Sequence, residues 1–270
     1  MVFRLAKFGS RCFRPGTLII SAVLMLALSG CSGGRRWDGF KFKRSNASED
    51  YLDMALESKR ADDRRKGVNG LAEGPDATTD WAIKVFETVA RTDTDAMVRR
   101  AALRALLRSA NGDRVPLTLK LLKSNDVEYE DVRPAPAPVR WSAARLLLAV
   151  AYDFTFREDQ EAEIVTTVLE QLPKENAQNV RLTLIEVLGY FQQRPVLDAL
   201  IAEMENEDFA IQHAAEMSLV SLTGVTHHHY PSAWREWLAK TDDPFARAGE
   251  TPDELQATRK KPRWDWLQWW

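Results

Sequence analysis

One helical phrase recurs five times in this chain of 270 residues, and it restricts the possible folds more than any other feature. The copies read "DRRKGVNGLAE" from Asp63, "VRRAALRALLR" from Val98, "VRWSAARLLLAVA" from Val139, "VRLTLIEVLGYF" from Val180 and "IQHAAEMSLVSL" from Ile211. In the copies from Val139 and Val180, apolar or small residues fall at i, i+4, i+7, i+8 and i+11, which is one face of an α-helix. The phrase therefore predicts five related amphipathic helices.

A second helical pattern precedes each copy. These segments are "SEDYLDMALES" from Ser48, "DWAIKVFETVAR" from Asp80, "RVPLTLKLLKS" from Arg114, "EAEIVTTVLEQL" from Glu161 and "PVLDALIAEME" from Pro195. Ser48 or Asn46 is the expected N-cap of the first segment, and Asp80 is that of the second. The copies start 35, 41, 41 and 31 residues apart, a period typical of helical hairpins that bury their apolar faces by stacking on one another. The sequence thus predicts an all-α fold in which residues 49–224 form an α-solenoid.

The opening Val-Arg of the phrase, followed by small residues, resembles HEAT repeats, including the short HEAT-like repeats of phycobilin lyases. The resemblance implies a right-handed α-solenoid of about five hairpins. In HEAT repeats an acid before the valine and the arginine after it often form a polar ladder between units, a pattern that Asp95 and Arg99 match. We expect Arg99, Arg140 and Arg181 to form such a ladder; the alternative is a basic stripe that binds an acidic ligand.

The N-terminal segment predicts where the protein works. An apolar run of 12 residues, Thr17 to Leu28, follows four basic residues. As a helix the run would be about 18 Å long, short of the roughly 30 Å hydrocarbon core, so it fits a signal peptide better than a permanent span. Leu28-Ser29-Gly30-Cys31 resembles the lipobox of bacterial lipoproteins. The alternatives are an uncleaved anchor and a plain secretory leader.

The lipobox resemblance implies that residues 1–30 are removed and that Cys31 carries diacylglycerol and an N-acyl chain, the only attached groups we expect. Ser32 after the cysteine implies sorting to the outer membrane rather than the inner one, on the periplasmic or extracytoplasmic side. Residues 31–48 form a tether with Arg35, Arg36 and Trp37. This tether either lies on the membrane or is a solvated spacer.

Charge and motif content exclude several functions. The net charge is −2 and falls to about −6 without the basic leader, so we expect no nucleic-acid partner. Cys31 is the one cysteine outside the leader, which excludes an internal disulfide and a CxxC metal site. The chain contains no evident catalytic triad, phosphate-binding glycine loop or paired-carboxylate signature. We therefore expect a protein that is not an enzyme.

The four histidines suggest the competing hypothesis. His213 lies in the last copy of the phrase, and His227, His228 and His229 follow as a run. Imidazoles bind Zn²⁺ and Cu²⁺, but three consecutive side chains cannot converge on one ion from a regular helix or strand. A metal-binding or lyase-like protein that uses this cluster is the alternative function.

Six of the nine tryptophans lie after residue 222. Residues 225–240 resemble the ending of bacterial HEAT arrays, and Trp234 and Trp237 are expected on one face of a capping helix. Residues 241–270 are predicted to be a flexible tail. Its last eight residues, "RWDWLQWW", contribute possible membrane or partner contacts through Trp264, Trp266, Trp269 and Trp270.

An insertion at residues 125–138, rich in acids and prolines, is either part of a partner-binding side or a decorative loop. Together these features predict a lipid-anchored, non-catalytic HEAT-repeat scaffold or adaptor, which binds an unidentified protein partner at the bacterial cell envelope.

Overall fold

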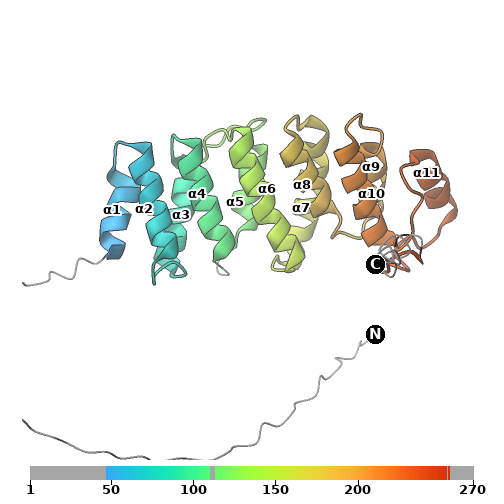
Figure 1. The fold of residues 1–270 in the computed structure, drawn as a ribbon, viewed down its shortest axis with the longest axis horizontal. Coiled ribbons are helices and arrows are strands. Elements are labelled where there is room, and N and C mark those ends of the chain that lie inside the picture. The colour runs from blue at the N-terminus through green and yellow to red at the C-terminus, as the bar shows by residue number, and fades with distance from the viewer. Residues whose placement is uncertain (1–46, 110–112, 254, 256–270) are drawn as a thin grey trace, which may run out of the picture. The chain divides into compact units, whose positions relative to one another are not determined.

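The computed structural model describes residues 47–109, 113–253 and 255, and it confirms the all-α prediction. Within these residues the chain forms eleven α-helices and no β-strand (Figure 1). The helices are α1 Ala47–Glu57, α2 Ala61–Glu73, α3 Asp80–Thr92, α4 Ala96–Arg108, α5 Val115–Lys123, α6 Ala137–Tyr152, α7 Glu158–Gln171, α8 Gln178–Leu188, α9 Arg194–Glu203, α10 Phe209–Thr223 and α11 Pro231–Lys240. A short 3₁₀ turn, Leu172–Lys174, follows α7.

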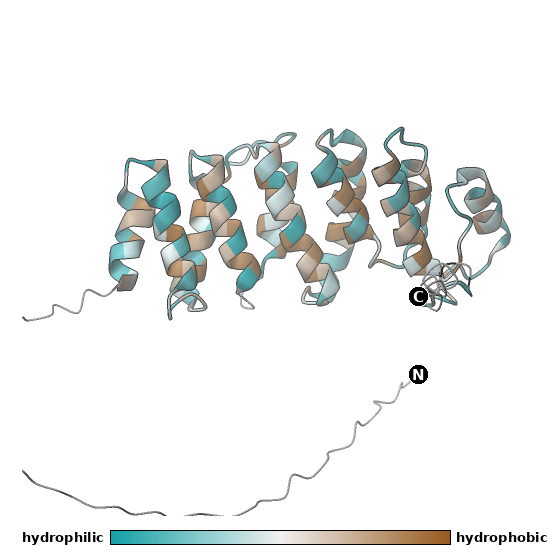
Figure 2. Ribbon diagram, viewed as in Figure 1, coloured by the Kyte–Doolittle hydropathy of each residue, from teal (hydrophilic) through white to brown (hydrophobic). Residues whose placement is uncertain are grey.

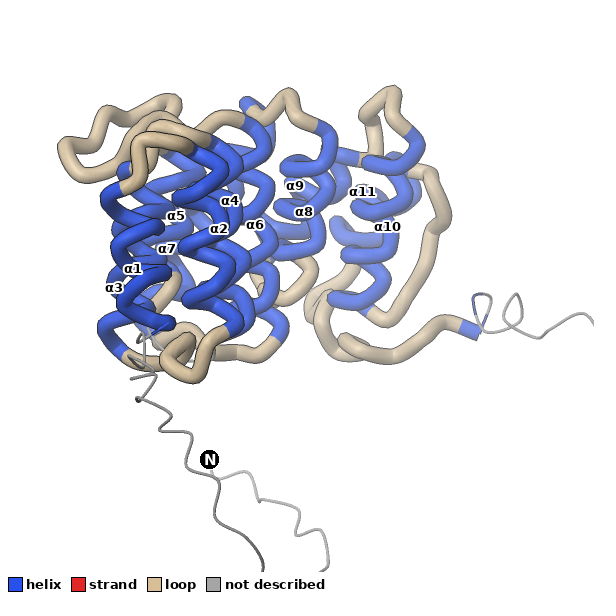
Figure 3. Tube along the Cα trace, turned by 60° about the vertical axis from the view of Figure 1, so that its left-hand side comes forward, coloured by secondary structure: helices blue, strands red, loops and turns tan. Residues whose placement is uncertain are grey.

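The helices from α2 to α10 are arranged in two layers. Even-numbered helices contact one another in succession from α2 to α10, and odd-numbered helices do so from α3 to α9 (Figures 1 and 3). Successive helices run in opposite directions, so the connections between them fall on two opposite edges. The lower edge of Figure 1 contains the start of α1 and the α6–α7 and α8–α9 turns, whereas the upper edge contains the α3–α4, α5–α6, α7–α8 and α9–α10 turns.

The apolar spacing of the repeated phrase explains which side of each helix is buried. Along α6, Val139, Ala143, Leu146, Leu147 and Val150 are each at most 2% exposed. Hydrophilic and hydrophobic residues accordingly alternate along the helices (Figure 2). Burial of a side chain such as Leu147 contributes about 1.5–3 kcal/mol, so the recurring face holds neighbouring pairs together.

The residues that precede the helices differ in part from the predicted N-caps. α1 begins at Ala47, so Ser48 lies inside the helix, and Thr79 rather than Asp80 precedes α3. Asp95 is a side-chain N-cap: its Oδ1 accepts hydrogen bonds from the backbone N–H groups of Met97 and Val98 at 2.8 and 3.1 Å. Ser48 and Asp80 are therefore not the caps, because a capping residue must precede the first helical residue. The alternative for the first helix, Asn46, lies outside the described residues.

The last part of the described chain returns to α10. α11 packs on α9 and buries Trp234 completely. α10 ends at Gly224, which has a φ of 68°, a left-handed conformation that favours glycine. Beyond α11, the N–H of Gly249 donates to the carbonyl of Ser221 at 2.9 Å. No helix in the described stretches is both long and apolar enough to cross a bilayer.

Candidate functional site

Several of the predicted site residues lie outside the residues that the structure describes. These are the lipidation candidate and the terminal contact candidates: Cys31, Arg35, Arg36, Trp37, Trp264, Trp266, Trp269 and Trp270. The described candidates are the ladder arginines, the insertion and the histidines.

The predicted ladder is present along the upper edge. The fourth residue of each even-numbered helix is an arginine or, in α10, a glutamine: Arg64, Arg99, Arg140, Arg181 and Gln212. Three of the arginines each form a two-pronged ion pair with a carboxylate of the next turn. The pairs are Arg64–Asp93, Arg140–Glu175 and Arg181–Glu203, and every N–O distance in them is 2.7 or 2.8 Å.

Arg99 belongs to the same ladder but contacts backbone carbonyls. It is 2% exposed, and its guanidinium donates to the carbonyls of Ala90, Arg133 and Pro134 at 2.8–3.0 Å. Asp95 does not pair with it, because that carboxylate caps α4. The arginines of the phrase therefore join neighbouring helical pairs, and the alternative of a ligand-binding stripe at these positions is wrong.

A different set of arginines faces solvent, and sequence analysis missed it. Arg104 and Arg108 are exposed on α4, and Arg100, one turn before them, is half-buried. None of the three has a carboxylate partner among the described residues. On α6, Trp141 lies 5.6 Å from the guanidinium of Arg100 and 5.4 Å from that of Arg145. We call these five residues the arginine face. Their spacing of four along "RAALRALLR" was a visible signal.

A shallow groove adjoins the arginine face. Its volume is about 310 Å³, and it is lined by Arg100, Trp141 and the first residues of α6 and α8. Neither helix has a hydrogen bond to the side chain of its N-cap residue, so the positive ends of their dipoles lie beside the groove. The local electrostatics of this layer therefore favour an anionic group.

The insertion at residues 125–138 is fastened to the upper edge. Asp131 pairs with Lys120 and Arg91 at 3.1 and 3.3 Å, and the N–H of Arg133 donates to the carbonyl of Arg91. The insertion lines an open hollow of about 650 Å³. Glu128 and Glu130 project from it and are exposed.

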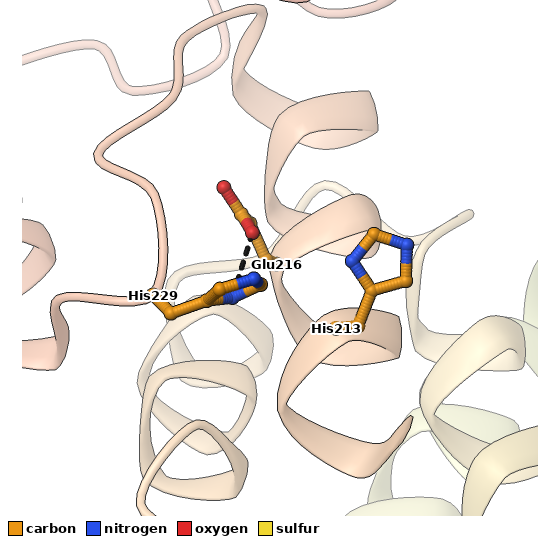
Figure 4. A group of neighbouring side chains, drawn as sticks. All are labelled: His213, Glu216 and His229. Atoms are coloured by element: carbon orange, nitrogen blue, oxygen red, sulfur yellow. Dashed lines mark ion pairs between the residues drawn. The ribbon is translucent and has the colours of Figure 1, made fainter. Parts of the chain in front are cut away.

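The structure separates the three histidines of the run. The ring of His227 packs 4.9 Å from Trp234, and His228 has a backbone φ of 52°. Only His229 turns toward α10, where it meets His213 and Glu216 (Figure 4). One ligand atom from each of these three side chains lies within 4.8 Å of the other two. We call this group the His–Glu cluster.

Glu216 is the unexpected member of the cluster. The eighth residue of every earlier even-numbered helix is buried and apolar, namely Val68, Leu103, Ala144 and Ile185. In α10 the same position is Glu216, which is only 5% exposed. Its Oε1 accepts a hydrogen bond from Thr226 at 2.9 Å, and its Oε2 lies 2.8 Å from Nδ1 of His229.

Comparison with known proteins does not assign the chain to a family: no protein-family model matches it, and no curated protein is similar to it.

Proposed function

We propose that this chain is a lipid-anchored scaffold of the bacterial envelope, built as a HEAT-type solenoid, that binds an acidic segment of a protein partner on its arginine face. The proposal combines the lipobox resemblance around Cys31 with the repeated helical pairs of residues 47–223. The charge on the layer of even-numbered helices supports the proposal most directly. Arg100, Arg104 and Arg108 have no carboxylate partner among the described residues, whereas the ladder residues Arg64, Arg140 and Arg181 are each paired with a carboxylate.

Trp141 adds a second reason to expect a partner there. Two guanidinium groups near one indole ring repel each other, and each gains only about 0.5–1 kcal/mol from the ring at an exposed site. A carboxylate between Arg100 and Arg145 would relieve that repulsion and form charge-assisted hydrogen bonds. Tryptophan and arginine are also the residues that most often dominate binding energy at interfaces.

The two edges suit an anchored scaffold. α1 begins at the lower edge, and the 15 residues between Cys31 and Ala47 reach at most about 55 Å when extended. At the same edge, Tyr152 and Phe154 are 66% and 67% exposed, and both rings lie edge-on to the ring of Tyr190. Aromatic side chains favour the membrane interface, so we propose that the lower edge faces the bilayer.

Site-specific photo-crosslinking in membranes tests the docking face. A photoreactive amino acid at position 104 of the full-length protein should yield one discrete adduct with a partner. The same group at Thr166, an exposed position of α7 in the other layer, should not. Adducts of equal yield from both positions, or none from position 104, would contradict the proposal.

A charge reversal with a matched control tests the chemistry. Arg104→Glu should reduce the adduct formed from a photoreactive group at position 145 at least tenfold, because a carboxylate then faces the acidic partner. Lys84→Glu changes an exposed charge of α3 by the same amount in the other layer and should leave the yield unchanged. Equal losses from the two variants would show that net charge, not the arginine face, governs binding.

A further inference from the structure

The loop between α10 and α11 holds His229 in one place. The N–H of His228 donates to Oγ1 of Thr226 at 3.0 Å, and Nε1 of Trp234 donates to the carbonyl of His228 at 3.1 Å. Trp234 is itself completely buried. A backbone φ of 52° at His228 is uncommon for a residue other than glycine and costs free energy. The surrounding contacts therefore impose the conformation that turns His229 toward Glu216.

The imidazole of His229 and the carboxylate of Glu216 lie close together without a hydrogen bond of regular geometry. Nδ1 of His229 is shielded from solvent and forms no hydrogen bond of regular geometry, although Oε2 of Glu216 lies 2.8 Å away. A buried carboxylate at a position that is otherwise apolar is costly unless it is fully paired. The nitrogen and the oxygen are close enough for one bound cation to contact both.

We propose that His213, Glu216 and His229 bind a divalent transition-metal ion, Zn²⁺ in particular. Two imidazoles and one carboxylate are a ligand set that Zn²⁺ uses in proteins. Zinc ligands at about 2.0–2.1 Å and tetrahedral angles lie about 3.4 Å from one another. The ligand atoms lie within 4.8 Å of one another. Nδ1 of His229 and Oε2 of Glu216, now 2.8 Å apart, would separate slightly around the ion, and the exposed ring of His213 can rotate toward it.

The surroundings of the cluster match those of a metal site. Oε1 of Glu216 is held by Thr226, which leaves Oε2 for the ion and resembles the outer hydrogen bonds that orient metal ligands. The ring of Phe209 stacks 6.0 Å from His213 and 5.2 Å from His229, edge-on to the second. Three protein ligands leave a fourth tetrahedral position for water, and His213 is exposed to solvent.

Metal analysis of the full-length protein in detergent tests this site. After equilibration with Zn²⁺ and removal of free metal, wild type should retain one more ion per chain than either His213→Ala or His229→Ala. The difference in zinc content between wild type and variant cancels any zinc that is bound elsewhere on the protein. X-ray absorption of the bound zinc should show two imidazole ligands. Wild type that holds no more zinc than either variant would overturn the proposal.

A matched variant distinguishes the cluster from the run of histidines. His228→Asn removes an imidazole but keeps a residue that tolerates positive φ, so zinc affinity should not change. Thr226→Val keeps the shape of the side chain and removes its hydroxyl donor, and it should weaken zinc binding about 10–100-fold. An equal loss from His228→Asn and His229→Ala would assign binding to the run and overturn the cluster. Circular dichroism of each variant verifies that the helices remain folded.

Discussion

Glu175 shows how a single ladder residue stabilises the molecule. Burial favours the neutral acid, but the hydrogen bonds from Arg140 and from the N–H of Ala177 outweigh it and lower the pKa of Glu175. A carboxyl group with a lowered pKa in the folded state stabilises the protein above its unfolded pKa, and this contribution is lost as the pH falls through the folded value.

This linkage predicts a pH-dependent effect of Glu175→Gln. At pH 7 the variant should lose about 1–3 kcal/mol of unfolding free energy, because Arg140 keeps its position but loses an anionic partner. As the pH falls below the unfolded pKa and through the lower folded pKa of Glu175, wild type protonates the same group, so the difference between the two proteins should shrink. Urea unfolding at pH 7 and pH 3 measures it. Glu205→Gln, in the exposed pair with Arg235, should have little effect at either pH, and a pH-independent loss from Glu175→Gln would contradict the argument.

At the scale of helices, α1 and α2 approach closely because α2 carries two glycines. A Cβ atom at Gly67 would lie 2.4 Å from the backbone nitrogen of Ala55, and one at Gly70 would lie 2.5 Å from the ring of Tyr51. Gly67→Ala should therefore force the helices apart and cost about 1–3 kcal/mol, despite the higher helix propensity of alanine. A denaturant midpoint equal to or above that of wild type would contradict this. Lys66→Ala, at the preceding exposed position, is the control and should change stability little.

The sequence predicted the helices better than it predicted their contacts. All ten helices of the pairs lie on the predicted segments, because the apolar spacing along each one matches the helical period. Asp95 was assigned to the ladder, yet it caps α4 and leaves Arg99 to backbone carbonyls. The pattern within one helix fixes which face is buried, whereas the partner of a polar side chain depends on how a neighbouring turn folds.

The same limit applied to the candidate sites. The sequence suggested the histidine run as a metal site because its three residues are consecutive. Consecutive side chains point in different directions from the backbone, however, and only His229 reaches the cluster. The His–Glu cluster needs a loop conformation set by Thr226 and Trp234, which no local pattern reveals. Glu216 was detectable in principle, since aligning the repeated phrase places it at a position that is apolar in every other copy.

At the scale of the whole molecule, the described helices bury two clusters of apolar side chains, one among the earlier helices and one among the later ones. α5 contributes residues to both clusters and so connects them. Val115, Leu119 and Leu122 pack toward the later helices, whereas Leu117 and Leu121 pack toward the earlier ones. In such a stack each pair of helices packs on the next, so the position of one end determines the position of the other. An anchor at one end and aromatic residues on the lower edge would then set the orientation of the arginine face toward a partner.

The last prediction separates the proposed anchor from the tryptophan-rich end. Cys31→Ser should release most of the protein from membranes, because two or three acyl chains hold a protein stably and the remaining contacts do not. In liposomes containing anionic lipid, the Cys31→Ser protein should retain a weak, salt-sensitive association through the basic and aromatic tether. Deleting residues 263–270 from it should weaken that association further if Trp264, Trp266, Trp269 and Trp270 enter the interface. Deletion without effect would assign these tryptophans to a protein contact, and membrane retention of Cys31→Ser equal to wild type would contradict the lipid anchor itself.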